Sequence, residues 1–307
     1  MKRPAGRYQL LKRAVGYKEL YLMLVPILAF YLIFSYVPMY GITLAFKDFN
    51  YAKGILASPW NQFANFKKLF ASADFWRAFR NTIIISLGRL IIEFPIPIIL
   101  ALFLNEISRS KLKRVYQTIL TFPHFLSWVV LSGIVITLLQ DQGVLNQILA
   151  LFGLGKNRLL VNGNQFVGLL FASNIWKEAG WSTILYMAAI AGINPELYEA
   201  ATLDGCSRMQ RMWYITWPGI LSTAAVLFIL QVGSAMNGGF DQVFNLYNSA
   251  VYSKGDIIDT YVYRSAFQSS DGFGFSTAVG FTKSVINFGL LYLANKVVSR
   301  LTGTGVI

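Results

Sequence analysis

The sequence has few charged residues, one cysteine and one histidine. Charged residues make up 13% of its 307 residues, roughly half of the share of about 25% that is usual for a soluble domain. Hydrophobic residues reach 55% and aromatic residues 15%, which indicates that the chain folds in lipid. The lone Cys206 excludes an internal disulfide, and the lone His124 excludes a metal site made of several histidines.

The sequence also lacks the motifs of a catalytic protein. It contains no G-x-x-x-x-G-K-[ST] and therefore cannot bind ATP as P-loop proteins do; "GLGK" at 153–156 lacks the first glycine. Asp256 and Asp259 form a carboxylate pair, but no His or Cys accompanies them, so we expect them to cap helices or to meet a partner protein. These absences predict a chain that is not an enzyme and binds no cofactor of its own.

The formal net charge of +13, from 27 basic and 14 acidic residues, does not predict nucleic-acid binding. The basic residues stand at the ends of apolar runs and form no continuous stripe. The first apolar run is long enough to span a membrane and has no small-residue cleavage site, so we expect it to be retained rather than removed as a signal peptide.

Six apolar runs have about the length of a spanning helix. They lie at about 20–46, 82–104, 118–139, 167–191, 219–236 and 277–298. Interior prolines such as Pro95 and Pro123 should kink these helices. The pattern predicts an all-α membrane protein, with a basic tail at 1–19 and one transmembrane domain over 20–307.

Lysine and arginine set the expected orientation, because they are enriched in cytoplasmic loops. They gather in the N-terminal tail and after the second span, at Arg109, Lys111, Lys113 and Arg114. Both termini and the connection at 194–218 are therefore expected on the cytoplasmic side of a cell membrane.

That connection contains "NPELYEAATLDG", which predicts a short polar helix. Asn194 can cap it, Pro195 fits its first turn, and Gly205 can adopt the left-handed conformation that ends it. Leu197, Ala200 and Ala201 give the helix a small apolar face suited to a docking partner. Composition alone leaves a solvated loop helix as an equal alternative.

The spacing of this segment resembles the cytoplasmic EAA signature of permease subunits in ATP-binding-cassette importers. The matching residues are Glu199, Ala200, Ala201, Asp204, Gly205, Ile215 and Pro218. Trp217 stands where leucine is usual, which affects packing at the start of the fifth span. "VPMYGITLAFKDFN", "FPHFLSWVV" and "SNIWKEAGWSTILY" extend the resemblance along nearly the whole chain to oligosaccharide permeases of the LplB type.

The resemblance implies a type I importer fold in a bacterial cell membrane, with coupling through the EAA residues. It also implies the partners: a second homologous permease, two cytosolic subunits that hold ATP and Mg²⁺, and an extracytoplasmic solute-binding protein. The expected cargo is an oligosaccharide, and acidic fragments such as those of alginate or pectin are among the substrates of the family.

Polar residues in the fourth and fifth spans are candidates for the substrate path, because sugars need flat rings and planar hydrogen-bonding groups. Spacing places Asn174, Lys177, Glu178 and Trp181 on one helical face. Resemblance to the maltose importer permease implies sugar contacts at Asn174, Glu178, Trp181, Gln231, Ser234 and Gly238, next to Asn237. An equally open alternative is that these polar groups form hydrogen bonds between helices and have only a structural role.

Two cations in the spans could attract an acidic sugar. Arg89 and Lys177 have carboxylates nearby at Glu93 and Glu178, so internal ion pairs are the favoured reading. Two other functions stay open: an ion-gradient-driven secondary transporter of a polar solute, which would show inverted repeats, and a membrane enzyme, which would need a carboxylate-rich or metal-ligand-rich cluster at the membrane face.

Overall fold

The computed structural model describes residues 17–269 and 271–302, and most of the basic tail predicted at 1–19 lies outside them. The described chain is helical throughout, and its β-type pairing is a single bridge between Lys47 and Trp60. This agrees with the all-α class that the long apolar runs predict.

Five helical segments of the described chain are long and apolar enough to cross a membrane. They are Lys18–Phe46, Ala73–Asn105, Trp128–Leu151, Arg208–Gly233 and Gly272–Arg300. The helix α11, Gly163–Ala191, covers the predicted fourth span and is 29 residues long. It is long enough to cross, but its polar residues make it too polar to qualify by composition alone.

Most of these segments consist of several consecutive elements. The first holds α2 (Lys18–Tyr31), η1 (Leu32–Tyr36), α3 (Val37–Met39) and η2 (Tyr40–Phe46). The second holds α6 (Ala73–Gly88), η3 (Arg89–Glu93) and α7 (Pro95–Asn105), and the fourth holds α13 (Arg208–Arg211), η5 (Met212–Thr216) and α14 (Trp217–Gly233). The last is α18 (Gly272–Thr302).

Shorter helices connect and flank these segments. They are α4 (Gly54–Ala57), α5 (Ala64–Ala71), α10 (Val144–Leu151), α12 (Pro195–Leu203), η6 (Ala235–Asn237), α15 (Phe240–Leu246), η7 (Ser249–Val251), α16 (Tyr252–Gly255) and α17 (Ile258–Phe267).

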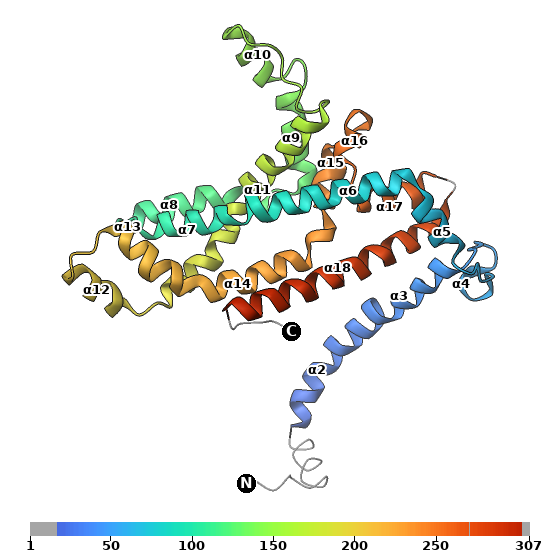
Figure 1. Cartoon of the computed structure of the whole chain (residues 1–307), viewed down its shortest axis with the longest axis horizontal. Helices are drawn as coiled ribbons and strands as arrows, with labels where there is room; N and C mark the ends of the chain where they lie inside the picture. Colours follow the sequence, from blue (N-terminus) through green and yellow to red (C-terminus); the bar gives the residue numbers. More distant parts are fainter. Residues whose placement is uncertain (1–16, 270, 303–307) are drawn as a thin grey trace.

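The helix predicted at 118–139 is broken in the structure. The chain forms α8 (Ser110–Thr121), a 3₁₀ turn η4 (Phe122–Phe125) and then α9 (Trp128–Leu139). Pro123 opens the turn because it cannot donate a backbone hydrogen bond, and Ser127 caps α9 by accepting from the backbone amide of Val130. The two helices point in different directions (Figure 1).

Three π-helical turns each stand directly before a proline. The amides of Val37, Phe94 and Trp217 bond to carbonyls five residues back, just ahead of Pro38, Pro95 and Pro218. A proline lacks the amide that continues an α-helix, and its ring clashes with the carbonyl four residues earlier, so the turn widens. The kinks predicted at Pro38 and Pro95 therefore take the form of local π-turns, and a similar turn precedes Pro218, which was expected to open the fifth span.

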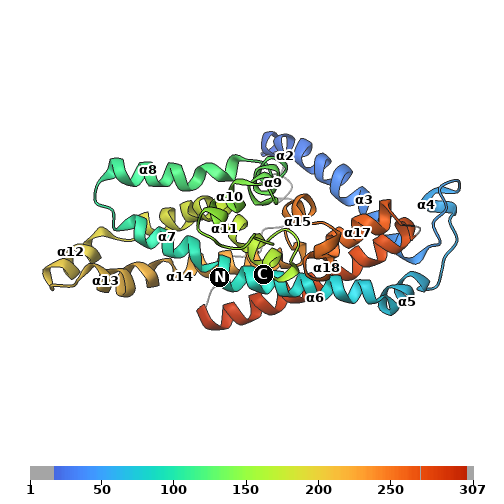
Figure 2. The ribbon, with the colours of Figure 1, turned by 90° about the horizontal axis from the view of Figure 1, so that it is seen from above.

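The helices α6, α7, α14 and α18 run along the long axis of the molecule (Figures 1 and 2). The short helix α12 lies at one end of this axis, and α4 and α5 lie at the other. The helix α11 crosses between α7 and α8 and packs against both. Gly180 permits this approach, because a side chain there would place its Cβ 2.0 Å from the carbonyl oxygen of Leu120.

Two apolar clusters hold the bundle together. One joins α7, α11 and α14 through Ile98, Leu102, Tyr186, Ile190 and Ile220. The other joins α6, α17 and α18 through Phe75, Ala78, Tyr261, Phe275 and Val279. A polar cavity lies beside the first cluster, on the side of α7 that carries η3.

Candidate functional site

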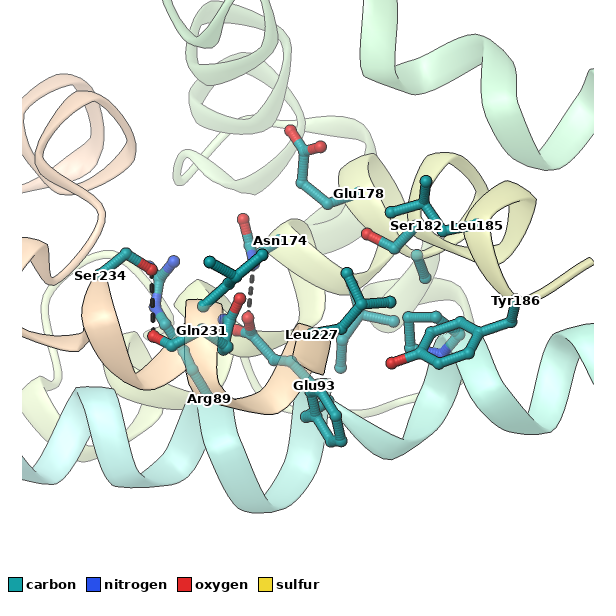
Figure 3. A pocket seen from close by; sticks show the side chains of 15 residues that line it. Arg89, Glu93, Asn174, Glu178, Ser182, Leu185, Tyr186, Leu227, Gln231 and Ser234 are labelled. Carbon is teal, nitrogen blue, oxygen red and sulfur yellow. Dashed lines mark hydrogen bonds between the residues drawn. The ribbon is translucent and has the colours of Figure 1, made fainter. Parts of the chain in front are cut away.

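The cavity has a volume of about 550 Å³ and lies between η3, α7, α11 and α14 (Figure 3). Its polar lining residues are Arg89, Glu93, Asn174, Glu178, Ser182, Gln231 and Ser234. Its apolar wall includes Phe94, Leu185, Tyr186, Leu227 and Leu230. Hydrogen-bonding side chains from three helices thus converge on one space, as in a site for a polar ligand.

Four of the eight predicted path residues line this cavity: Asn174, Glu178, Gln231 and Ser234. Asn237 and Gly238 line a second hollow of about 210 Å³, which shares Arg89, Gln231 and Ser234 with the first. A third hollow, of about 360 Å³, lies beyond Asn237 and Gly239 and is walled by Trp128, Phe240, Asp241, Gln242 and Asp259. Shared walls make the three hollows a linked series.

The other two predicted path residues, Lys177 and Trp181, do not line the hollows. The Lys177 side chain is buried, and its ammonium group lies 2.8 Å from a Glu178 carboxylate oxygen. It also donates a 2.8 Å hydrogen bond to the carbonyl oxygen of His124. Successive helical residues point about 100° apart, so Lys177 turns toward η4 while Glu178 reaches the cavity.

His124, which was not predicted as a site residue, is joined to the same cluster. Its Nδ1 lies 2.7 Å from Oε2 of Glu178, and its ring stacks on Trp181 with centroids 4.3 Å apart and planes 3° from parallel. His124, Lys177, Glu178 and Trp181 therefore fasten the break between α8 and α9 to the middle of α11. The sequence gave no sign of this contact, because His124 and Glu178 are 54 residues apart in the chain.

The ion pair predicted between Arg89 and Glu93 is absent from the ion pairs of the described residues. Arg89 Nη2 instead donates to Oε1 of Gln242 at 2.6 Å, and the Asn174 amide donates to Glu93. Both residues belong to the π-turn η3 and line the same cavity, but each is held by a partner from another helix. The predicted direct ion pair was wrong, because spacing along one helix does not show the partners that other helices bring.

The EAA residues lie on and after α12, at the end of the molecule away from α4 and α5 (Figure 1). Asn194 caps the helix by accepting from the Glu196 amide at 3.1 Å, and Pro195 occupies the first turn. Gly205 adopts the left-handed conformation with φ of +78°, and the amide of Cys206 bonds back to the carbonyl of Ala201. The predicted start and end of this helix are confirmed.

No side chain of α12 is buried within the described chain. Glu199 and Ala200 are exposed and Ala201 is half-buried, while Leu203 beside them is 89% exposed. Two side-chain contacts join the helix to the next segment: the Tyr198 hydroxyl lies 2.9 Å from the Thr216 hydroxyl of η5, and Arg211 of α13 donates to Thr202. Of the later motif residues, Ile215 lies in η5 and Pro218 in α14.

Asp256 and Asp259 also have structural partners. Asp256 is fully buried and accepts two hydrogen bonds from the Arg264 guanidinium, at 2.6 and 2.7 Å. Asp259 pairs with Lys283 at 2.6 Å. Burial raises the pKa of Asp259, and the Lys283 ammonium group partly opposes that rise. These carboxylates stabilise the packing of α17, and the described residues contain no cluster able to hold a metal ion.

Comparison with known proteins gives a consistent result. Residues 93–302 match the family described as binding-protein-dependent transport system inner membrane component. The polygalacturonan/rhamnogalacturonan transport system permease YteP of Bacillus subtilis is 40% identical over 301 residues, which cover 98% of this chain and 94% of the relative. Protein LplB of the same organism is 41% identical over 290 residues, covering 94% and 91%.

Two solved structures also resemble this chain over nearly its whole length. One is a bacterial ABC transporter involved in the import of the acidic polysaccharide alginate, with 38% identity, a TM-score of 0.88, and coverage of 96% of this chain and 99% of that one. A second is the bacterial alginate ABC transporter in complex with an alginate pentasaccharide-bound periplasmic protein, again with 38% identity and a TM-score of 0.88, covering 97% and 100%.

Proposed function

The chain belongs to the inner membrane components of binding-protein-dependent transport systems, and from its place among the sugar permeases of that family we propose that it imports acidic oligosaccharides. It is a permease subunit of an ABC importer, and the ATPase activity of the importer is proposed to reside in other subunits. The observation that carries the acidic class is the likeness over nearly the whole chain to two permeases of polyuronate importers, one for polygalacturonan and one for alginate.

The cavity between η3, α7, α11 and α14 is the proposed path through this subunit. Its volume of about 550 Å³ lies within the range of about 300–1,000 Å³ that is typical of small-molecule sites. Amide, hydroxyl and carboxylate groups line one side and apolar groups the other, which suits the hydroxyls and the apolar face of a sugar ring. A second homologous permease is proposed to complete the path.

The motif on α12 is proposed to receive the motion of a cytosolic ATPase. Two such subunits would hold ATP and Mg²⁺, and their closure would push on Glu199, Ala200 and Ala201. The contacts of Tyr198 with Thr216 and of Thr202 with Arg211 would pass that rigid-body movement to η5 and α14, which forms one cavity wall. The cavity would open toward an extracytoplasmic solute-binding protein, take up the sugar and then face inward.

Uptake by the whole transporter tests this proposal. Both permeases and both ATPases are reconstituted in proteoliposomes. The solute-binding protein is added on one side of the membrane and ATP on the side of the ATPases. Uptake of a galacturonate tetramer and of a neutral maltotetraose is then measured. We expect ATP-dependent uptake of the acidic tetramer. Uptake of the neutral sugar alone, or uptake that follows an ion gradient without ATP, would refute the proposal.

A further inference from the structure

Arg89 stands out among the charged residues that line the linked hollows. It lines both the first cavity and the second hollow, and it is the only charged residue among the described residues that line the second. Among the described ion pairs, none involves Arg89. A guanidinium group is permanently charged and carries five N–H donors, so this side chain brings to the path a positive charge that no carboxylate contacts directly.

Neutral groups hold the guanidinium in place. Gln242 is fully buried, and its Nε2 donates to the carbonyl of Leu170 at 2.7 Å and to the hydroxyl of Ser173 at 2.8 Å. Its amide is thereby fixed with Oε1 toward Arg89, whose Nη2 donates to it at 2.6 Å. An amide acceptor orients the arginine without neutralising it, which a carboxylate in the same place would do.

Backbone geometry leaves room for this arrangement. Gly239 has φ of +77°, and a Cβ at this position would lie 2.3 Å from Nη2 of Arg89. The guanidinium therefore lies directly against the turn that separates the second hollow from the third. Arg89 bonds to Gln242 through Nη2, and because Nε is buried, the donors left for a solute are the remaining N–H groups of the two Nη atoms.

The other charged groups of the first cavity already have partners. Glu93 accepts from the Asn174 amide, and Glu178 is held by Lys177 and His124 (Figure 3 shows Glu93, Asn174, Glu178 and Arg89). Lys177, the other cation considered from the sequence, is buried, paired and outside the lining. The two cations therefore differ in their surroundings: Lys177 is buried and paired outside the lining, and Arg89 lines the hollows where a solute would lie.

We propose that Arg89 binds a carboxylate of the transported sugar, with Gln242 as the positioning residue that presents its guanidinium to the second hollow. This assignment rests on the proposed function and adds the group in this subunit that distinguishes acidic from neutral sugars. A guanidinium and a carboxylate pair through two parallel hydrogen bonds, so a uronate carboxylate fits the free donors of Arg89. The sugar hydroxyls then face the acceptors of the first cavity.

The variant Arg89→Gln tests the assignment in the reconstituted transporter. Uptake of a galacturonate tetramer and of its methyl-esterified, neutral counterpart is measured together with ATP hydrolysis, and sugar transported per ATP is compared. A hydrogen bond to a charged group contributes about 1.5–3 kcal/mol, which corresponds to a loss of roughly ten- to a hundredfold in acidic transport per ATP. Arg89→Lys keeps the charge and should retain part of the transport.

Lys177→Gln is the matched control, because it removes a cation from the same region that does not line the path. We expect it to leave the preference for the acidic over the esterified tetramer unchanged. Acidic transport per ATP that survives Arg89→Gln would overturn the assignment. Equal losses for both tetramers, or a loss of ATP hydrolysis itself, would also overturn it by showing a structural role for Arg89. Absence of uptake by the unmodified transporter would instead refute the proposed function.

Discussion

The cavity and the helix α12 differ in where their side chains find partners. In the cavity region, Asn174, Glu178 and Gln242 bind groups from other helices of the same chain. In α12 no side chain is buried, and Leu203 is 89% exposed. The cavity is therefore largely assembled by this chain, whereas the side chains of α12 find few partners within the described residues.

The largest effect is expected on the α12 side of this comparison. In Glu199→Lys, a charge reversal on an exposed face should abolish ATP hydrolysis stimulated by the loaded binding protein, while membrane insertion is unchanged, because Glu199 has no partner role within the described fold. Hydrolysis by the reconstituted transporter and protein yield in membranes are the measurements.

Glu196→Lys is the control for that change, since Glu196 is an exposed acid of the same helix, outside the EAA motif. It should leave most of the stimulated hydrolysis in place, apart from a small loss of helix stability at the N-terminal turn. If Glu199→Lys retains full hydrolysis and uptake, Glu199 has no part in docking, and the contrast between the two regions fails.

A smaller effect is expected for a change beside the cavity, and it should lower the stability of the protein rather than the coupling of transport to ATP hydrolysis. Lys177→Met should leave the carbonyl of His124 and the carboxylate of Glu178 without their common donor. Loss of a buried charged partner costs about 1–3 kcal/mol or more, so the thermal midpoint of the purified subunit should fall. Lys113→Met, on the amphipathic helix α8 outside this network, serves as the control. An unchanged midpoint in Lys177→Met would mean that the cluster does not stabilise the break before α9.

The two regions also differ in how much of them the sequence predicts. Asn194, Pro195 and Gly205 act on a helix within a few residues of themselves, so the limits of α12 follow from local propensity. The partners of Arg89 and Glu178 are 153 and 54 residues away, at Gln242 and His124. No local pattern predicts such contacts, because they arise only when helices pack.

Two prolines change the geometry of the spans that the sequence predicts. Pro95 was expected to kink its helix, and it does so through the π-turn η3. Within that turn, Arg89 and Glu93 bond to Gln242 and Asn174 rather than to each other. Pro123 likewise turns one predicted span into α8 and α9. In both places the sequence predicts that the proline disturbs the helix. It does not predict the contacts that the side chains beside the proline make with other helices.

The smallest predicted effect tests the contact that links the two regions. Tyr198→Phe removes the hydroxyl that lies 2.9 Å from Thr216, and with it one of two side-chain contacts between α12 and the segment formed by α13 and η5. Such a hydrogen bond is worth about 0.5–1.5 kcal/mol, so sugar transported per ATP should fall by roughly two- to tenfold while ATP hydrolysis continues. Tyr214→Phe is the matched control, because Tyr214 is 79% exposed in the same π-turn. Equal coupling in both variants would show that the Tyr198 hydroxyl does not transmit the movement, and would leave that role to the contact of Arg211 with Thr202 and to the covalent connection through Gly205.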